Sequence, residues 1–317
     1  WQDWGAVPPG DSSNERAGTS GAAFCSPSTS AVTPLPELGA NSPQPKGTFD
    51  VAKQLLIYEN AVPVTTQQHG ETSIKAGTGY DFARGVNSVP LTTVEFANSA
   101  SEYTIVFTGS GDEIMPAVIL GMRDQENLYI NDDGLWDARY VPAFVRRYPF
   151  VFSSSEDGQT FTLCVDEGFE GCNNEGRGER LFDADGQQIQ YLKGVLAFLQ
   201  DYQAQFQRTK AFCKTLQDLN LLEPMQAMFT LGSGEQASMA GFMGIERERL
   251  KALTGDQLAE LARTDALELA YLQLHSLRNL SAMANRLTPQ QAAASGEPVE
   301  EPVAEKPAAK KKTTKKS

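Results

Sequence analysis

The sequence predicts an α+β fold, in which an antiparallel, β-rich N-terminal half packs with a helical C-terminal half in a single domain. In the first half, short runs of β-branched and aromatic residues recur at spacings near ten residues, which is typical of antiparallel strands. In the second half, apolar residues recur at steps of three and four, the period of amphipathic helices. Strands followed by helices indicate α+β rather than alternating α/β.

The strands predicted in the β-rich half are short. They cover residues 54–58, 94–96, 103–107, 115–120, 128–130, 150–152 and 160–165. Residues 131–134, Asn-Asp-Asp-Gly, are a strong turn signal because Asn, Asp and Gly tolerate the backbone conformations of tight turns. Pro142 fits the first position of a short helix, and Pro149 ends it.

The helical half begins with one long amphipathic helix at residues 187–219, which we expect to end near Pro224. A short β-like pair, 228–231 and 238–242, follows around a glycine-containing turn. Three helices then close the core, at 246–253, from the capping-box residue Thr254, and at 265–280.

The predicted domain spans residues 51–287, and both ends differ from it in composition. Residues 1–50 are rich in Pro, Ser and Gly, and residues 288–317 are rich in Pro, Ala and Lys. Segments with so few large apolar residues cannot bury enough surface to offset their chain entropy, so we expect both to be disordered. The remaining roughly 240 residues suffice for a core without disulfides or metal.

The net charge is −13, although the last 12 residues carry six lysines and no acid. An acidic protein repels nucleic-acid phosphates, so no specific nucleic-acid partner is expected. No apolar run reaches the roughly 18 residues of a transmembrane span. No signal peptide is visible, which predicts a cytoplasmic location, with an envelope-associated or exported protein as the alternative.

The residues that usually carry catalysis or bind metals are few. The chain has two histidines and four cysteines, and no cysteine pair has metal-site spacing. We therefore expect no metal, no cofactor and no catalytic histidine, and no catalytic residue can be named. His69 is expected to be solvated in a loop. Cys164 and Cys172 are expected to be reduced thiols, with a disulfide between them as the alternative.

The strongest candidate site lies in residues 129–152, where seven aromatic residues, three arginines and three aspartates gather. Aromatic faces stack on sugars or flat ligands, and Arg and Asp side chains bind hydroxyls or anions. The same composition is also typical of a core in which arginines pack over aromatic rings. The candidate ligand- or partner-binding residues are Asp132, Asp133, Trp136, Arg139, Tyr140, Arg146, Arg147 and Tyr148.

Several motifs occur in the order found in one known family. They are residues 54–58 with Val62 and Pro63, then 87–91, 116–121, 136–152, 173–182 and 272–277. On these motifs the chain resembles the bacterial SapC family over residues 53–280. The resemblance implies association with a surface layer of a Gram-negative bacterium and proximity to outer-membrane receptor genes for nutrient uptake. It implies no catalytic residues.

These observations lead to two functional hypotheses. The first is a non-enzymatic bacterial accessory protein of the surface layer or cell envelope, which binds a protein or glycan. The alternative is a small-molecule enzyme with an Asp or Glu plus Arg site and an unknown reaction. A deep pocket that places Asp132, Asp133 or Glu179 beside Arg146 would favour the enzyme, whereas a shallow exposed aromatic patch would favour binding.

Overall fold

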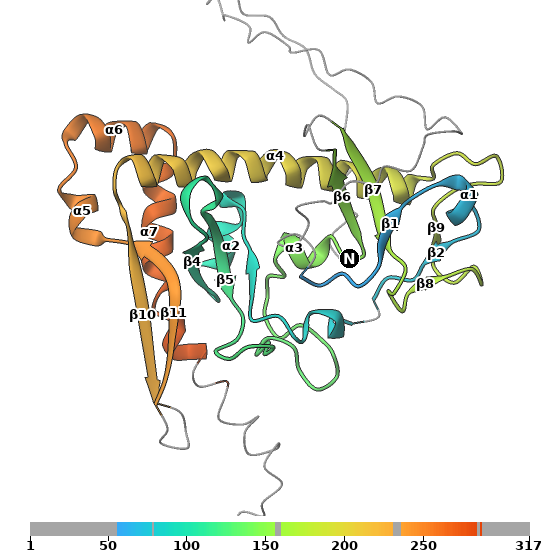
Figure 1. The fold of residues 1–317 in the computed structure, drawn as a ribbon, viewed down its shortest axis with the longest axis horizontal. Helices are drawn as coiled ribbons and strands as arrows, with labels where there is room; N and C mark the ends of the chain where they lie inside the picture. The colour runs from blue at the N-terminus through green and yellow to red at the C-terminus, as the bar shows by residue number, and fades with distance from the viewer. Residues whose placement is uncertain (1–55, 78, 156–159, 231–235, 284–285, 287–317) are drawn as a thin grey trace, which may run out of the picture.

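The fold class is as predicted. The computed structural model describes residues 56–286 except 78, 156–159, 231–235 and 284–285. Antiparallel sheets occupy most of the N-terminal half, and helices gather towards the C-terminus (Figure 1). The two predicted disordered ends lie outside the described residues, as do positions 54 and 55 of the first predicted strand.

The largest sheet has five strands, all antiparallel, in the order β10-β11-β4-β5-β3. Its strands are β3 (Ser88–Pro90), β4 (Thr104–Thr108), β5 (Met115–Ile119), β10 (Leu222–Thr230) and β11 (Gln236–Ile245). The central strands β4 and β5 consist almost entirely of buried residues, as expected for a sheet covered on both faces. They match the predicted strands 103–107 and 115–120.

Two three-stranded sheets lie at the other end of the molecule (Figure 1). One has the order β1-β7-β6 and the other β8-β2-β9. Their strands are β1 (Ala61–Pro63), β2 (Ser73–Ile74), β6 (Phe150–Ser154), β7 (Phe161–Asp166), β8 (Cys172–Asn173) and β9 (Glu179–Arg180). β6 and β7 match the predicted strands at 150–152 and 160–165.

A single long helix, α4 (Gln190–Asp218), runs along the molecule past both groups of sheets (Figure 1). The other helices are short: α1 (Thr66–His69), α2 (Phe96–Ser99), α3 (Ala143–Arg146), α5 (Arg247–Lys251), α6 (Gly255–Arg263) and α7 (Ala266–Ser276). Single 3₁₀ turns cover Asp81–Ala83, Thr93–Glu95 and Gly111–Glu113. The predicted capping box is present at Thr254, which bonds reciprocally with Gln257 at the start of α6.

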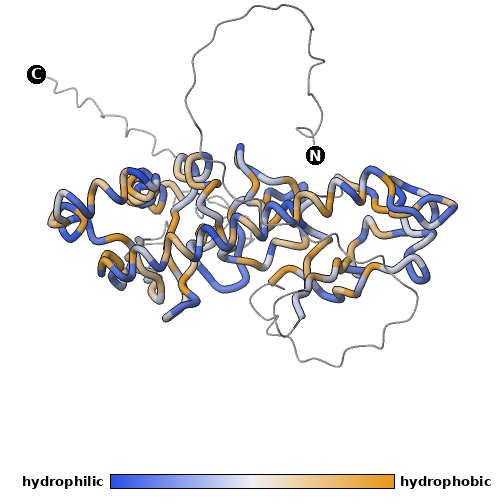
Figure 2. The backbone as a smooth tube through the Cα atoms, turned by 90° about the horizontal axis from the view of Figure 1, so that it is seen from above, coloured by the Kyte–Doolittle hydropathy of each residue, from blue (hydrophilic) through white to orange (hydrophobic). Residues whose placement is uncertain are grey.

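The core consists of two clusters of buried hydrophobic residues, and α4 contributes to both. Phe212, Cys213 and Leu216 of α4 belong to the larger cluster, around the five-stranded sheet. Leu192 and Leu199 belong to the smaller one, beside the two small sheets. Hydrophobic stretches are accordingly spread along the whole length of the molecule (Figure 2).

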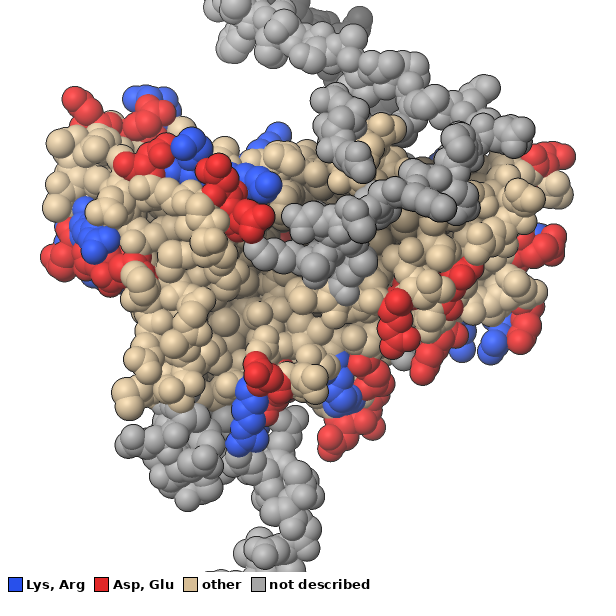
Figure 3. Space-filling view, viewed as in Figure 1, with Lys and Arg blue, Asp and Glu red and all other residues tan. Residues whose placement is uncertain are grey.

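On the face shown in Figure 3, the visible charged side chains lie mainly at the margins. They gather over α5 and α6, and the uncovered middle of that face carries few. The α5 and α6 charges include the ion pairs Lys251–Glu248, at 2.9 Å, and Arg263–Glu260. Among the described helices, none has the length and apolar composition needed to cross a bilayer.

Two of the predicted strands are wrong. Ile57 lies in a turn and Tyr58 in no regular element, because both bury their side chains in the core without pairing to a neighbouring strand. Residues 94–96 belong instead to a 3₁₀ turn and the start of α2. The reason is a capping box: Thr92 and Glu95 bond reciprocally and begin the helical turn.

Two further expectations need correction in detail. Residues 128–130 form only an isolated bridge, between Ile130 and Trp136. The predicted pair at 228–231 and 238–242 is a longer hairpin, β10 and β11, and Pro224 lies within β10 rather than ending α4. Pro224 is tolerated there because β10 is an edge strand, where a missing N–H is least costly.

The expectation that His69 is solvated is wrong. Its side chain is buried at the end of α1, and its Nδ1 accepts a hydrogen bond from the Thr65 amide at 3.2 Å. The ring therefore closes the first turn of this short helix instead of facing water. Cys164 and Cys172 are free thiols, as is Cys213.

Gln273 of α7 connects the hairpin β10-β11 with the other three strands, β4, β5 and β3, of the five-stranded sheet. β11 and β4 share one paired position, Met243 opposite Phe107. Beside it, the fully buried Gln273 donates from Nε2 to the Ile105 carbonyl at 3.0 Å, and its Oε1 accepts from the Ile245 amide at 3.2 Å. One side chain thus satisfies backbone groups of both strands.

Replacing Gln273 with methionine, which has a similar volume, should leave these two buried backbone groups unpaired. We expect the free energy of unfolding to fall by roughly 2–4 kcal/mol, since an unsatisfied buried group costs about 1–3 kcal/mol. Urea denaturation followed by circular dichroism measures the change. Gln200→Met on the exposed side of α4 is the control and should change stability by less than about 0.5 kcal/mol. Equal stability of the two variants would contradict the joining role.

Candidate functional site

The structure distributes the eight predicted site residues over three places. Asp132 and Asp133 lie in an exposed turn. The turn is closed by the Gly134 amide, which donates to the Asn131 carbonyl at 3.0 Å, and by the Leu135 amide, which donates to Asn131 Oδ1 at 2.9 Å. Neither aspartate lines a cavity with the arginines.

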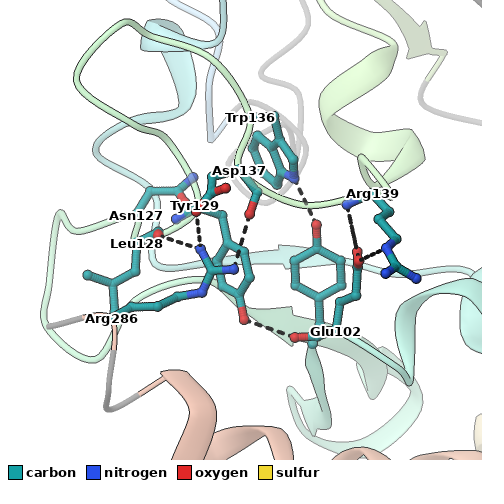
Figure 4. A network of polar contacts seen from close by, with 9 residues as sticks. Glu102, Asn127, Leu128, Tyr129, Trp136, Asp137, Arg139 and Arg286 are labelled. Atoms are coloured by element: carbon teal, nitrogen blue, oxygen red, sulfur yellow. Dashed lines mark hydrogen bonds and ion pairs between the residues drawn. The ribbon is translucent and has the colours of Figure 1, made fainter.

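Trp136, Arg139 and Tyr140 belong to a network that anchors the segment to the core, and Figure 4 shows the part of it around Trp136 and Arg139. Trp136 is partly buried and donates from Nε1 to the Tyr103 hydroxyl at 2.8 Å. That hydroxyl in turn donates to the Tyr140 carbonyl. Because burial raises the pKa of Tyr103, the phenol remains protonated and remains a donor.

Glu102 binds the backbone amides of Arg139 and Tyr140. Its carboxylate accepts the Arg139 amide at 3.0 Å and the Tyr140 amide at 3.1 Å. The Arg139 side chain itself is 97 % exposed, and its Nε lies 3.9 Å from Glu102. The backbone here is fixed, whereas the guanidinium of Arg139 extends into solvent (Figure 4).

Arg286 attaches the end of the described chain to the same segment. Its Nη1 donates to Asp137 at 2.8 Å and to the Leu128 carbonyl at 3.3 Å, and its Nη2 donates to the Asp137 carbonyl at 3.1 Å. The guanidinium lies 4.4 Å from the ring centroid of Tyr129. Burial raises the pKa of Tyr129 to about 12, against a smaller opposing effect of Arg286. The network is therefore structural in character.

Glu95 determines where α3 begins. Only 2 % exposed, its carboxylate accepts four hydrogen bonds. Oε2 accepts from the amide and hydroxyl of Thr92 at 2.9 and 2.8 Å. Oε1 accepts from the Tyr140 hydroxyl at 2.9 Å and the Ala143 amide at 2.7 Å. Such charge-assisted bonds are the strong ones in a protein, and this set fixes the first turn of α3 against the larger core cluster.

The short helix α3 places Arg147 among aromatic rings. Arg147 is buried, and its guanidinium lies over three rings, 4.2 Å from the centroid of Phe144, 5.2 Å from Tyr202 and 5.6 Å from Tyr58. Burial raises the pKa of Tyr58 to about 12, although the charge and hydrogen bond of Arg147 lower it. This part of the segment matches the prediction that arginines pack over aromatic rings.

Tyr148 is held on the other side by a second buried carboxylate. Asp166 accepts the amides of Glu59, Asn60 and Gly168 at 2.8, 3.0 and 3.0 Å. Burial raises the pKa of Tyr148, and the charge of Asp166 and a hydrogen bond to it raise it further. The Tyr148 ring stacks on Phe82 with centroids 4.0 Å apart.

Arg146, Arg147 and Tyr148 line one cavity of about 580 Å³, at the junction of the two core clusters. Its walls come from α3 and β6, α4, the end of β2, the start of β9, the segments that follow β2 and β7, and Leu135. Most of the lining is aromatic or aliphatic: Ile74, Tyr80, Phe82, Leu135, Val145, Tyr148, Phe150, Phe169, Tyr191, Val195 and Phe198. The charged lining residues are Arg146, Arg147 and Glu179.

One face of α4 forms a wall of this cavity. Tyr191, Gly194, Val195 and Phe198 occur at positions i, i+3, i+4 and i+7, so they share a helix face. A Cβ placed on Gly194 would meet no atom within 4 Å. A glycine inside a helix costs about 1 kcal/mol relative to alanine, and here it leaves open space in the wall.

Sequence reasoning missed most of this wall. It recognised α4 as amphipathic but assigned its apolar face to the core as a whole. Gly194 is the signal that was available, because a glycine on the apolar face of a long helix marks a place where the packing leaves room. The buried carboxylates Glu95 and Asp166 gave no signal, since their roles depend on contacts between distant residues.

The acid–base groups at the cavity are limited. Glu179 is exposed and is the one carboxylate in the described lining, which contains no His, Cys, Ser or Lys. Burial raises the pKa of the lining tyrosines Tyr80, Tyr148 and Tyr191, so these phenols are neutral at physiological pH. In the part of the chain that is described, no three His, Cys, Asp or Glu side chains gather as a metal site would require.

The fold and the cavity together define an α+β protein with a ligand-sized, largely apolar cavity and two arginines in its lining. The chain belongs to the SapC family, whose model matches residues 64–283. That range includes the five-stranded sheet, α4 and every lining residue of the cavity. No curated protein and no solved structure matches the chain.

Glu95→Gln should destabilise the protein although it keeps the shape of the side chain. All four groups bonded to Glu95 are hydrogen-bond donors. An amide offers one oxygen and one NH₂ group, so the NH₂ group would face two of these donors and leave them without an acceptor. We expect the free energy of unfolding to fall by roughly 2–4 kcal/mol. Urea denaturation tests this, with the exposed Glu170→Gln as control. Unchanged stability would mean that Glu95 does not fix α3.

Gly194→Ala should stabilise the protein, because the open space accepts the methyl group and alanine is the better helix former. We expect an increase of about 0.5–1 kcal/mol in the free energy of unfolding. Thermal and urea denaturation against wild type measure it. A decrease in stability would show that the wall beside Gly194 is closed rather than open.

Proposed function

We propose that this protein is a non-enzymatic accessory protein associated with the surface layer or cell envelope of a bacterium, and that it acts by binding a protein or glycan partner. The single observation that carries the proposal is the cavity of about 580 Å³ lined by aromatic rings and two arginines. Its volume falls within the roughly 300–1,000 Å³ of ligand pockets. Membership of the SapC family supports the association with the envelope.

Binding fits the lining better than catalysis does. General acid–base or nucleophilic catalysis requires a nucleophile and a base within hydrogen-bond reach of each other. The described lining offers one exposed carboxylate, Glu179, and tyrosines whose pKa burial raises. Aromatic faces beside guanidinium groups suit recognition of a flat or ring-shaped group of the partner.

One observation favours a small-molecule enzyme as the second candidate, because it meets the criterion set above for an enzyme, a pocket that holds Glu179 together with Arg146. Glu179 lines the same cavity as Arg146 and Arg147, so a carboxylate and two cations border one space. In such a reaction Glu179 would act as the acid or base, and the arginines would bind an anionic substrate. Glu179→Gln separates the candidates: it should abolish turnover by an enzyme, whereas capture of a partner should survive it.

Partner capture tests the proposal. The full chain is immobilised and exposed separately to envelope and cytosolic fractions of the native bacterium, and bound proteins and glycans are identified by mass spectrometry. Two variants alter the cavity, Arg146→Met by removing charge and Gly194→Leu by filling space. Arg208→Met, an exposed arginine of α4 outside the cavity, is the matched control.

We expect an envelope component that wild type and Arg208→Met capture equally and that both cavity variants lose by at least roughly tenfold, as expected when a central contact is removed. Equal capture by all variants would remove the cavity from the proposal. A fourth variant, Arg139→Met, alters the exposed part of the segment, and loss of capture in this variant alone would transfer the site there. The same fractions, probed for the native protein, decide between the cytoplasmic location expected from the sequence and the envelope-associated or exported one.

A further inference from the structure

We infer that the cavity takes up a carboxylate carried on an apolar body, such as an arylalkyl acid. The inference rests on the proposed function in that it concerns the same cavity, and it adds the chemistry of the group that enters. Three features support it: the balance of charge in the lining, the way in which Arg146 is held, and the apolar character of the remaining walls.

The charge of the lining is opposite to that of the protein. The chain as a whole carries −13, whereas the described lining has two arginines against the single carboxylate Glu179. Arg147 is buried, and in surroundings of low dielectric its charge acts more strongly than at the surface. A positive cavity in an acidic protein concentrates small anions at that one place.

Arg146 is positioned in advance at the border of the cavity. Its Nε donates to the Val141 carbonyl at 3.0 Å and its Nη2 donates to the Tyr140 hydroxyl at 3.3 Å. Its guanidinium lies 5.6 Å from the ring centroid of Tyr140 and 5.5 Å from that of Phe198. These contacts are to neutral groups, so they restrict the side chain without cancelling its charge.

The exposed guanidinium of Arg146 can therefore receive an anion. Neither hydrogen bond uses Nη1, and among the described residues no carboxylate lies within ion-pair distance of it. Planar guanidinium groups bind carboxylates through two parallel N–H donors, which is stronger than a contact between neutral groups. A ligand carboxylate at this point would supply the charge partner of Arg146.

The walls beyond the arginines select for an apolar body. Phe82 and Phe169 from the loops, Val195 and Phe198 from α4, and Phe150 from β6 present rings and branched aliphatic groups to the space. Sugars and other polyhydroxyl compounds would leave most of their hydroxyls without partners there, which is costly, so of the two proposed partner classes the lining favours a protein over a glycan. A flat or branched apolar body instead gains by removing this surface from water.

The experiment compares three probes that share one body and differ only in the charge of the head group. They are 3-phenylpropionate, 3-phenylpropanamide and 3-phenylpropylamine. Ligand-detected NMR and titration calorimetry on the full chain measure their affinities at pH 7. Wild type, Arg146→Met, Gly194→Leu and the control Arg208→Met are compared.

We expect 3-phenylpropionate to bind wild type at least roughly tenfold more tightly than the amide or the amine, since one charge-assisted contact separates them. Arg146→Met should reduce the affinity for the acid roughly tenfold and leave the amide unchanged. Gly194→Leu should weaken all three probes by occupying the space. Arg208→Met should behave as wild type does.

Two results would overturn the inference. Equal binding of the three probes would show an apolar cavity without preference for anions, and no binding of any probe would show that arylalkyl groups do not enter. Partner capture is measured independently of these probes. If capture depends on the cavity but the probes do not discriminate, only the present inference fails. If the probes discriminate but capture ignores the cavity, the proposed function fails.

An arylalkyl carboxylate is offered both by free acids and by the last residue of a protein chain. A tripeptide, N-acetyl-Gly-Gly-Phe, is therefore titrated with a free and with an amidated C-terminus. Tighter binding of the free-carboxylate peptide than of 3-phenylpropionate would identify a chain terminus as the source. Weaker binding of the peptide would identify a free acid. A free-carboxylate peptide that binds no better than its amide, together with equal binding of the three small probes, would contradict the inference for both sources.

Discussion

The arrangement of this protein depends on a buried carboxylate, that of Glu95, which accepts four hydrogen bonds from Thr92, Tyr140 and Ala143. A buried charge is tolerated only where donors surround it, so the two chain segments that provide the donors, one at Thr92 and one at Tyr140 and Ala143, must meet at one place. Their meeting fixes the start of α3. Because α3 has a single turn, its start also fixes the direction in which Arg146 and Arg147 leave the backbone.

The position of Arg147 follows from this constraint. The aromatic rings around Arg147 must in turn lie where their faces meet its guanidinium. A buried guanidinium needs compensation, and the rings of Tyr58, Phe144 and Tyr202 provide part of it through their faces. These rings come from the segment before β1, from α3 and from α4, which lie far apart in the sequence. The same cation therefore helps to hold together the two halves of the fold and contributes positive charge to the cavity.

The helix α4 explains why a cavity exists here. This helix of 29 residues serves both core clusters, with Leu192 and Leu199 in one and Phe212 and Leu216 in the other. Where the clusters meet, the sheets on the two sides do not continue into each other. Gly194 and its neighbours then face space instead of side chains. The binding function that we propose uses this gap between two packed regions, where a ligand can enter without a change in the core.

The sequence by itself determined the fold class, the strands β4 to β7, the helix α4 and the capping box of α6, because each depends on local periodicity or on residues within one turn. It also singled out the segment that contains Arg146, Arg147 and Tyr148. Only the tertiary structure separated these three from Asp132, Asp133, Trp136, Arg139 and Tyr140, placed α4 beside them, and buried His69. The reason is physical: a cavity is a property of what packing leaves empty, and that depends on contacts between residues about a hundred positions apart, such as those of Asp166 with Glu59 and Asn60.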